Sequence, residues 1–143
     1  MDTIAQLFWL TINLYHEARG EPFEGMKAVC HVVLNRAERR KIPVKEVVLQ
    51  PWQFSWANKG VRPGIHDYEA FEKCMKAAYE TIQERLEGKT LAGADHYHTM
   101  QVNPAWNRKM PVVAKIGNHI FYNSEASSIR GEGSFCFLPF ILF

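Results

Sequence analysis

Two glutamates lie four positions apart in the segment 15–22, YHEARGEP, and the first has the setting of an acid catalyst. Glu17 is predicted to lie on the last turn of a helix, where the negative end of the helix dipole and a partial loss of water both favour a protonated carboxyl. A general acid that works at neutral pH needs such an environment. We therefore predict that Glu17 is the catalytic acid and that Glu21 supports it by pairing with or capping this segment. An exposed glutamate near a helix end is the alternative, and it is the more common case for an arbitrary glutamate.

Aromatic and polar residues gather in the predicted loops downstream of this glutamate. Aromatic rings stack on the apolar faces of sugars, while Gln, Asn, Ser and His side chains hydrogen-bond hydroxyl and acetamido groups. This combination predicts a carbohydrate-binding groove, although about half of the rings are expected only to fill the core. The residues predicted to contact substrate are Gln53, Phe54, Ser55, Trp56, Tyr97, His98, Trp106, His119 and Tyr122.

The first of three long predicted helices carries Glu17 near its end. This helix is expected to stop where Gly20 adopts a left-handed conformation and Pro22 cannot continue a helix. Its apolar residues at helical spacing, predicted to be buried, are Ile4, Leu7, Phe8, Thr11, Leu14, Tyr15 and Ala18. Another long helix is expected to begin at the N-cap Asp67 and to stop before Gly88. Its predicted core stripe is Phe71, Cys74, Met75, Ala78, Tyr79, Ile82 and Leu86.

The helix predicted between these two, residues 24–39, is apolar on nearly all sides and should therefore be central. Asn35 and Arg36 interrupt it, and we expect them to bond neighbouring loops because buried polar groups need partners. Residues 44–49 are predicted to form one or two further helical turns.

Two short runs near the end of the chain, 96–98 and 116–122, are predicted to pair as a small β-ribbon. Helices dominate the rest, so the predicted fold is α+β and mainly α. A length of 143 residues is enough for one domain, residues 1–143, to bury its own core. The last nine residues, 135–143, are almost wholly apolar and have no partner in the pattern.

Composition excludes several classes of function. The formal net charge is +2, and the short basic cluster at 36–41 lacks the interleaved aromatics of a nucleic-acid groove. No segment is long enough to span a bilayer, so no stable membrane insertion is expected. Cys30, Cys74 and Cys136 form an odd count that favours buried free thiols and a reducing compartment. No signal peptide is visible, which predicts synthesis in the cytoplasm.

Several ordered blocks of this sequence resemble the spore-cortex-lytic (SleB/CwlJ-like) family of cell-wall hydrolases. The first covers residues 17–22, 24–25 and 28–36, and the later blocks are QFS at 53–55, GADHY within 93–97 and IGNHIFY at 116–122. The resemblance spans about residues 4–123 and leaves 124–143 as an atypical tail. The chain is similar to short lysins of phages and prophages, which carry this module without the separate binding domain of the spore enzymes.

The resemblance implies a lysozyme-like catalytic domain, with an aromatic-lined groove, that cuts the β-1,4 bond between N-acetylmuramic acid and N-acetylglucosamine in peptidoglycan. The family's catalytic glutamate corresponds to Glu17, which would protonate the glycosidic oxygen. Water could complete the reaction as in a muramidase, or the muramic 6-hydroxyl could close a 1,6-anhydro ring as in a lytic transglycosylase. The implied protein is a monomer that uses no metal or cofactor. It binds the glycan strands of the cell wall, which it reaches after release from the cytoplasm or as part of a virion.

Two alternatives from other classes compete with the glycosidase. His96, His98 and His119 could form a three-histidine zinc site of a peptidoglycan amidase or peptidase. Against this, the His16-Glu17 pair is not followed by the second histidine of a His-Glu-x-x-His helix. The second alternative is a non-catalytic glycan-binding module, in which the Glu17 carboxylate only bonds sugar hydroxyls.

Overall fold

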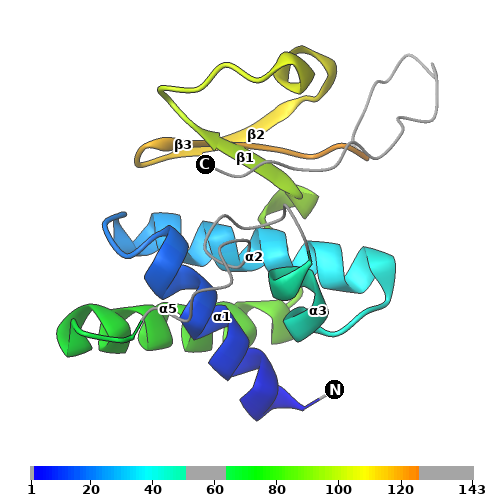
Figure 1. Ribbon diagram of the computed structural model, residues 1–143. Coiled ribbons are helices and arrows are strands. Elements are labelled where there is room, and N and C mark those ends of the chain that lie inside the picture. The colour runs from blue at the N-terminus through cyan, green and yellow to red at the C-terminus, as the bar shows by residue number, and fades with distance from the viewer. Residues whose placement is uncertain (1, 51–63, 126–143) are drawn as a thin grey trace.

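The structure is a computed structural model that describes residues 2–50 and 64–125. Its helices are α1 (Thr3–Glu17), α2 (Phe23–Arg40), α3 (Val44–Leu49) and α5 (Tyr68–Leu86), its 3-10 helices are η1 (Leu91–Gly93) and η2 (Ala105–Lys109), and its strands are β1 (His96–Thr99), β2 (Val112–Ile116) and β3 (His119–Tyr122). Figure 1 shows a small sheet on one side of the molecule and the helices on the other, with α2 lying between the sheet and α5. The predicted fold, α+β and mainly helical with a small β-ribbon, is confirmed.

Helix α2 forms the centre of the domain, as its sequence predicts. Every residue from Gly25 to Ala37 except Lys27 is buried. The helix contacts α1, α3 and α5 on one side and η1, β1 and β2 on the other. A helix that is covered on both sides has no solvent-facing stripe over this length, which explains why its pattern is apolar nearly all round.

Helix α1 ends earlier than predicted, and it does not end through a left-handed glycine. The chain leaves the helix at Ala18 (φ −139°, ψ 15°), whose N–H still donates to the carbonyl of Leu14 at 2.8 Å. The N–H of Glu21 then donates to the carbonyl of Ala18 at 3.0 Å, so a turn closes the helix end. Gly20 has no positive φ, and the prediction for it is wrong.

The buried stripes of α1 and α5 agree only in part with those predicted. Ile4 and Phe8 are exposed, and so are Met75, Tyr79 and Leu86. Thr11, Leu14 and Tyr15 in α1 and Cys74 and Ala78 in α5 are buried as predicted, and the residues buried in addition are Leu10 and Asn13 in α1 and Ala77 and Thr81 in α5. Small side chains let α5 approach its neighbours closely, and apolar periodicity alone does not decide which of two overlapping stripes faces the core.

The sheet has the strand order β1-β3-β2, and both pairings are antiparallel. The predicted ribbon is the β1–β3 pair, in which Tyr97 lies opposite Phe121. The sequence did not indicate β2 as a separate strand. Its side chains are mostly exposed or half-buried, and an irregularity between Val112 and Ala114 breaks the alternation that marks a strand.

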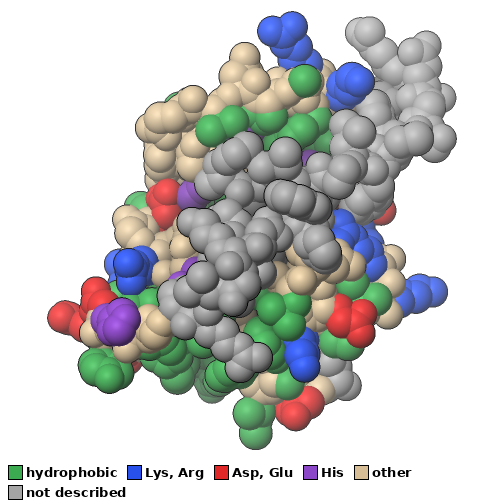
Figure 2. Space-filling model, in the orientation of Figure 1, with side chains coloured by type: hydrophobic (Ala, Val, Ile, Leu, Met, Phe, Trp, Pro, Cys, Tyr) green, Lys and Arg blue, Asp and Glu red, His purple; other side chains and the backbone are tan. Residues whose placement is uncertain are grey.

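The predicted buried free thiols are present in the described part of the chain. Cys30 and Cys74 are buried free thiols, and Cys136 lies outside the described residues. No helix within residues 2–50 and 64–125 combines the length and the hydrophobicity needed to cross a membrane. On the face drawn in Figure 2, acidic and basic side chains are interspersed instead of forming one large patch of a single sign.

Candidate active site

Glu17, the last residue of α1, is half-buried at the junction of the helices and the sheet. Burial lowers the pKa of the neighbouring Arg36 guanidinium to about 10, and the negative charge of Glu17 is among the influences that act in the opposite direction. Burial also raises the pKa of the Tyr97 hydroxyl well above its usual range, and the charge of Glu17 adds to that rise. The Glu17 carboxyl therefore interacts with one residue of α2 and one of β1, both of which are buried.

Arg36 has a part in this site that its sequence position indicates only weakly. Its side chain is 0% exposed, and its Nε donates to the backbone carbonyl of Asp95 at 2.8 Å, so the predicted bond to a neighbouring loop is present. With a pKa of about 10 the guanidinium is charged at neutral pH. In the sequence, the signal that could have indicated this role of Arg36 is the presence of an arginine inside an otherwise apolar helix.

Asp95, immediately before β1, holds the edge of the sheet on α2. Its carboxylate is 0% exposed and accepts from Arg39 Nη1 at 2.7 Å, from the ring of His96 at 2.8 Å, from the backbone N–H of Ser124 at 2.9 Å and from the Ser124 hydroxyl. Burial opposes ionisation, but the bonds from His96 and Ser124 outweigh it and lower the pKa of Asp95. This carboxylate is therefore ionised, enclosed and fully engaged in structural bonds.

Glu21 directs both carboxylate oxygens at the turn between β2 and β3. Oε1 lies 3.0 Å from Nδ1 of His119, and Oε2 accepts from the backbone N–H of Asn118 at 3.3 Å. The backbone of Gly117 passes so close that a Cβ there would lie 2.8 Å from the same Oε2. The predicted pairing role of Glu21 therefore has a definite partner, a hairpin almost a hundred residues further along the chain.

The strand register divides the predicted sheet residues between two faces. Residues directly opposite each other in an antiparallel pair point to the same face, and side chains alternate along each strand. The pairs Tyr97–Phe121 and Thr99–His119 therefore place Tyr97 and His119 on one face. Their rings lie edge to face with centroids 5.0 Å apart, and Tyr97 belongs to the main hydrophobic core. His96, His98 and Tyr122 point to the opposite face.

The opposite face carries an ordered aromatic cluster around Trp106. The Trp106 ring lies 5.0 Å from the ring of His96, 5.7 Å from His98 and 5.4 Å from Tyr122, each in an edge-to-face arrangement. Nδ1 of His98 is 2.7 Å from the carbonyl of Thr99, which only accepts, so Nδ1 carries the proton in the neutral ring. Nε2 of His98 then accepts from the Tyr122 hydroxyl at 2.7 Å. Hydrogen bonds thus fix the orientation of this part of the sheet.

Exposure separates the residues predicted to contact substrate. Tyr97, His98, His119 and Tyr122 are at most 6% exposed and lie largely in the interior, whereas Trp106 is half-buried and presents part of its ring to solvent. Sugar stacking needs an accessible ring face, so among these five Trp106 has the most suitable setting. The other predicted contacts, Gln53, Phe54, Ser55 and Trp56, lie outside the described residues.

The arrangement of histidines does not match the three-histidine zinc site that was considered as an alternative. His96 and His98 share one face of the sheet and His119 lies on the other, where it contacts Glu21. Within residues 2–50 and 64–125, no group of three or more His, Cys, Asp or Glu side chains is arranged to hold a metal ion. The described donors therefore do not fit a resident metal.

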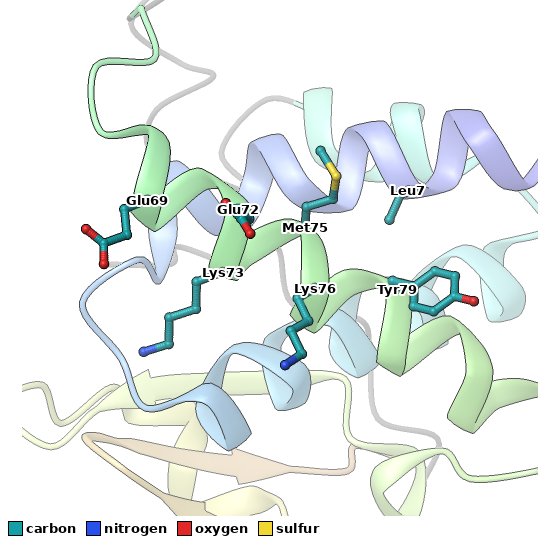
Figure 3. Close-up of a pocket in the computed structure, with 7 residues that line it drawn as sticks. All are labelled: Leu7, Glu69, Glu72, Lys73, Met75, Lys76 and Tyr79. Carbon is teal, nitrogen blue, oxygen red and sulfur yellow. The ribbon is translucent and has the colours of Figure 1, made fainter.

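A hollow on the described surface lies elsewhere. It has a volume of about 650 Å³ and is lined by Leu7 of α1 and by six residues of α5, with carboxylates and lysines side by side (Figure 3). None of the residues predicted for acid catalysis or sugar contact lines it. This hollow is therefore separate from the candidate site around Glu17.

Comparison with known proteins identifies the family. The profile of the Cell Wall Hydrolase family matches residues 20–122, which is most of the chain. The chain belongs to the cell wall hydrolase family. The matched range contains Glu21, Arg36, Asp95 and the sheet, and Glu17 lies just before it. The resemblance to cell-wall hydrolases inferred from the ordered blocks is thus confirmed.

Two curated relatives of this cell wall hydrolase are both named spore cortex-lytic enzymes. It is 30% identical over 117 residues to a spore cortex-lytic enzyme of Halalkalibacterium halodurans, covering 77% of this chain and 32% of that protein. It is 27% identical over 112 residues to the spore cortex-lytic enzyme of Bacillus subtilis, covering 76% and 34%. The chain thus spans about a third of the length of these curated relatives.

Solved structures extend the likeness to the fold. The catalytic domain of the Bacillus cereus SleB protein matches with a TM-score of 0.67 and 27% identity, covering 86% of this chain and 93% of that domain. The catalytic domain of the germination-specific lytic transglycosylase SleB from Bacillus anthracis matches with a TM-score of 0.66 and 27% identity, covering 85% and 97%. This cell wall hydrolase therefore has the fold of the SleB catalytic domains.

Proposed function

We propose that this cell wall hydrolase is a peptidoglycan glycosidase that cleaves the β-1,4 bond between N-acetylmuramic acid and N-acetylglucosamine, with Glu17 as general acid. The observation that carries the proposal is the half-buried Glu17 carboxyl at the end of α1, whose charge acts on the buried Arg36 and Tyr97. Membership in the cell wall hydrolase family and the match to a lytic transglycosylase support a peptidoglycan substrate and cleavage of its glycan strand. The proposed place of action is accordingly the bacterial cell wall.

The state of the other carboxylates near the site favours a lytic transglycosylase route. Hydrolases that invert or retain configuration normally use a second carboxylate as base or nucleophile. Glu21 has both oxygens directed at the β2–β3 hairpin, and Asp95 is enclosed by Arg39, His96 and Ser124. Neither is placed to serve as the second carboxylate. We propose that Glu17 performs both proton transfers.

In the proposed reaction, Glu17 gives its proton to the glycosidic oxygen as the bond from C1 of the muramic residue breaks. The 6-hydroxyl of the same muramic residue then attacks C1 and returns its proton to the Glu17 carboxylate. The product is a 1,6-anhydro ring, no water is consumed, and Glu17 ends in its starting state. The positive charge of Arg36 stabilises the carboxylate that exists between the two transfers.

The test compares wild type and Glu17→Gln on purified peptidoglycan, with muropeptides analysed by mass spectrometry. Glu17→Gln keeps the size of the side chain but cannot supply a proton, so release should fall about 10²–10⁴-fold. Glu46→Gln, which removes an exposed carboxylate on α3, is the matched control and should keep full activity. Anhydro-muramic ends support the transglycosylase route, and reducing muramic ends indicate hydrolysis.

Other outcomes contradict the proposal directly. Undiminished release by Glu17→Gln removes Glu17 from the chemistry. Freed stem peptides from an intact glycan indicate an amidase, and loss of activity in EDTA indicates a metal enzyme. Binding without any product, equal for wild type and variant, indicates a glycan-binding module.

A further inference from the structure

The contact between Glu21 and the β2–β3 hairpin joins two parts of the site that are far apart in sequence. Glu21 follows the end of α1, and its Oε2 accepts from the N–H of Asn118 at 3.3 Å. Its Oε1 lies 3.0 Å from Nδ1 of His119, where burial lowers the pKa of the imidazole and the Glu21 charge partly opposes that lowering. Both side chains are largely shielded, at 14% and 4% exposed, so water screens this contact only weakly.

The hairpin turn is shaped to receive this carboxylate. Gly117 has a φ of +57°, and a Cβ at that position would lie 2.8 Å from Oε2 of Glu21 and 2.9 Å from Cδ of Pro22. Any side chain there would push the turn away from the loop that links α1 and α2. The close approach therefore depends on a glycine in the turn and on the acceptor that faces it.

His119 in turn contacts Tyr97, a buried residue on which the charge of Glu17 acts. Its ring packs edge to face on Tyr97, with centroids 5.0 Å apart and planes at 89°. The Tyr97 hydroxyl is buried without a hydrogen-bond partner among the described residues. No hydrogen bond to the described residues fixes that hydroxyl, so the packing of the ring must locate it. The charges of Glu17 and Glu21 both act on it.

We propose that Glu21 is a positioning residue, whose carboxylate fastens the β2–β3 hairpin to the end of α1 and, through His119, holds Tyr97 beside Glu17. The inference rests on the proposed function of Glu17. It assigns Glu21 no proton transfer and no contact with the scissile bond. A displaced catalytic group can cost about 100-fold in rate for a shift of roughly 1 Å, so loss of the fastening should be visible in activity.

The experiment compares Glu21→Gln and Glu21→Ala in the full chain, with Glu46→Ala as the matched control. Gln keeps an oxygen that accepts from Asn118 and is neutral, whereas Ala removes both contacts. Glu21→Gln should keep kcat within about threefold of wild type, and Glu21→Ala should lower kcat about 10- to 100-fold with a smaller change in KM. Hydrogen exchange of the backbone amides at 117–121 should rise in Glu21→Ala and stay unchanged in Glu21→Gln and Glu46→Ala.

A second variant reaches the same contact from the hairpin. Gly117→Ala leaves the Glu21 side chain intact but places a methyl group in the space of its Oε2. It should lower kcat and raise exchange at 117–121 as Glu21→Ala does. This keeps the inference testable if Glu21→Ala does not fold.

The outcomes separate this inference from the proposed function. Equal losses in Glu21→Gln and Glu21→Ala, with hairpin exchange unchanged, would show that Glu21 takes part in the chemistry and overturn its positioning role. Full activity of Glu21→Ala despite increased exchange would overturn it as well. If wild type does not cleave peptidoglycan, the proposed function fails, while unchanged exchange in Glu21→Ala shows separately that the fastening is absent.

Discussion

The burial of His96 predicts a steep loss of stability in acid that can be assigned to this one residue. The side chain is 1% exposed, packs on Trp106 and faces the Asp95 carboxylate through Nδ1 at 2.8 Å. Burial lowers the pKa of His96 to about 4, and the attraction of Asp95 only partly offsets this. The folded protein therefore holds His96 neutral at pH values where the unfolded chain has already bound a proton.

The sign and the size of the effect follow from this difference. As the pH falls, the unfolded chain gains a proton near the ordinary value of 6.5, whereas the folded protein gains it near pH 4. The free energy of unfolding therefore decreases between those values and is restored as the pH rises. The span from 6.5 to about 4, at about 1.4 kcal/mol per pH unit, corresponds to about 3 kcal/mol.

Urea denaturation at a series of pH values from 7.5 to 4 measures this effect. His96→Asn removes the titrating group, and its amide can still donate to Asp95. The variant should be less stable at pH 7.5 because it loses the ring contact, but its free energy of unfolding should decrease by about 3 kcal/mol less than that of wild type over the range. His66→Asn, at an exposed histidine, is the control and should follow wild type. Equal decreases in wild type and His96→Asn would refute the reasoning.

Two further predictions concern the core. Asp95→Ala leaves Arg39 and the N–H of Ser124 without their shielded acceptor, so it should cost about 3–5 kcal/mol in urea denaturation, and a cost below about 1 kcal/mol would contradict the network. Burial raises the pKa of both Cys30 and Cys74, the latter to about 11, so iodoacetamide at pH 8 should modify neither in the folded protein. Residue-resolved mass spectrometry with and without urea measures this, and rapid labelling of either thiol in the folded state would show that the core is open.

Much of the local structure follows from the sequence because the interactions involved are local. Asp67 accepts from the N–H of Ala70 at 3.0 Å as a predicted N-cap, and α2 is central as its apolar pattern requires. The helices at 44–49 and 68–86 and the ribbon at 96–98 have the predicted types. The errors in the predicted buried residues arise where packing between distant segments decides which side of a helix faces the core. The exposed Ile4 and Phe8 match a helical stripe as well as the buried residues do.

The candidate site, like the fold, was predictable from the sequence only in part. The sequence by itself determined the residue types and the ordered blocks, and from these came the family, the catalytic glutamate as a prediction and the pairing role of Glu21. Only the tertiary structure decided which distant groups meet. It brought the buried Arg36 and Tyr97 within the electrostatic influence of Glu17, put His119 on the opposite face of the sheet from His96 and His98, and brought Asn118 to Glu21 across 97 positions of the chain. Such contacts between distant residues depend on strand register and helix packing. Both are set by the whole core at once, so they leave no periodic signal in any one segment.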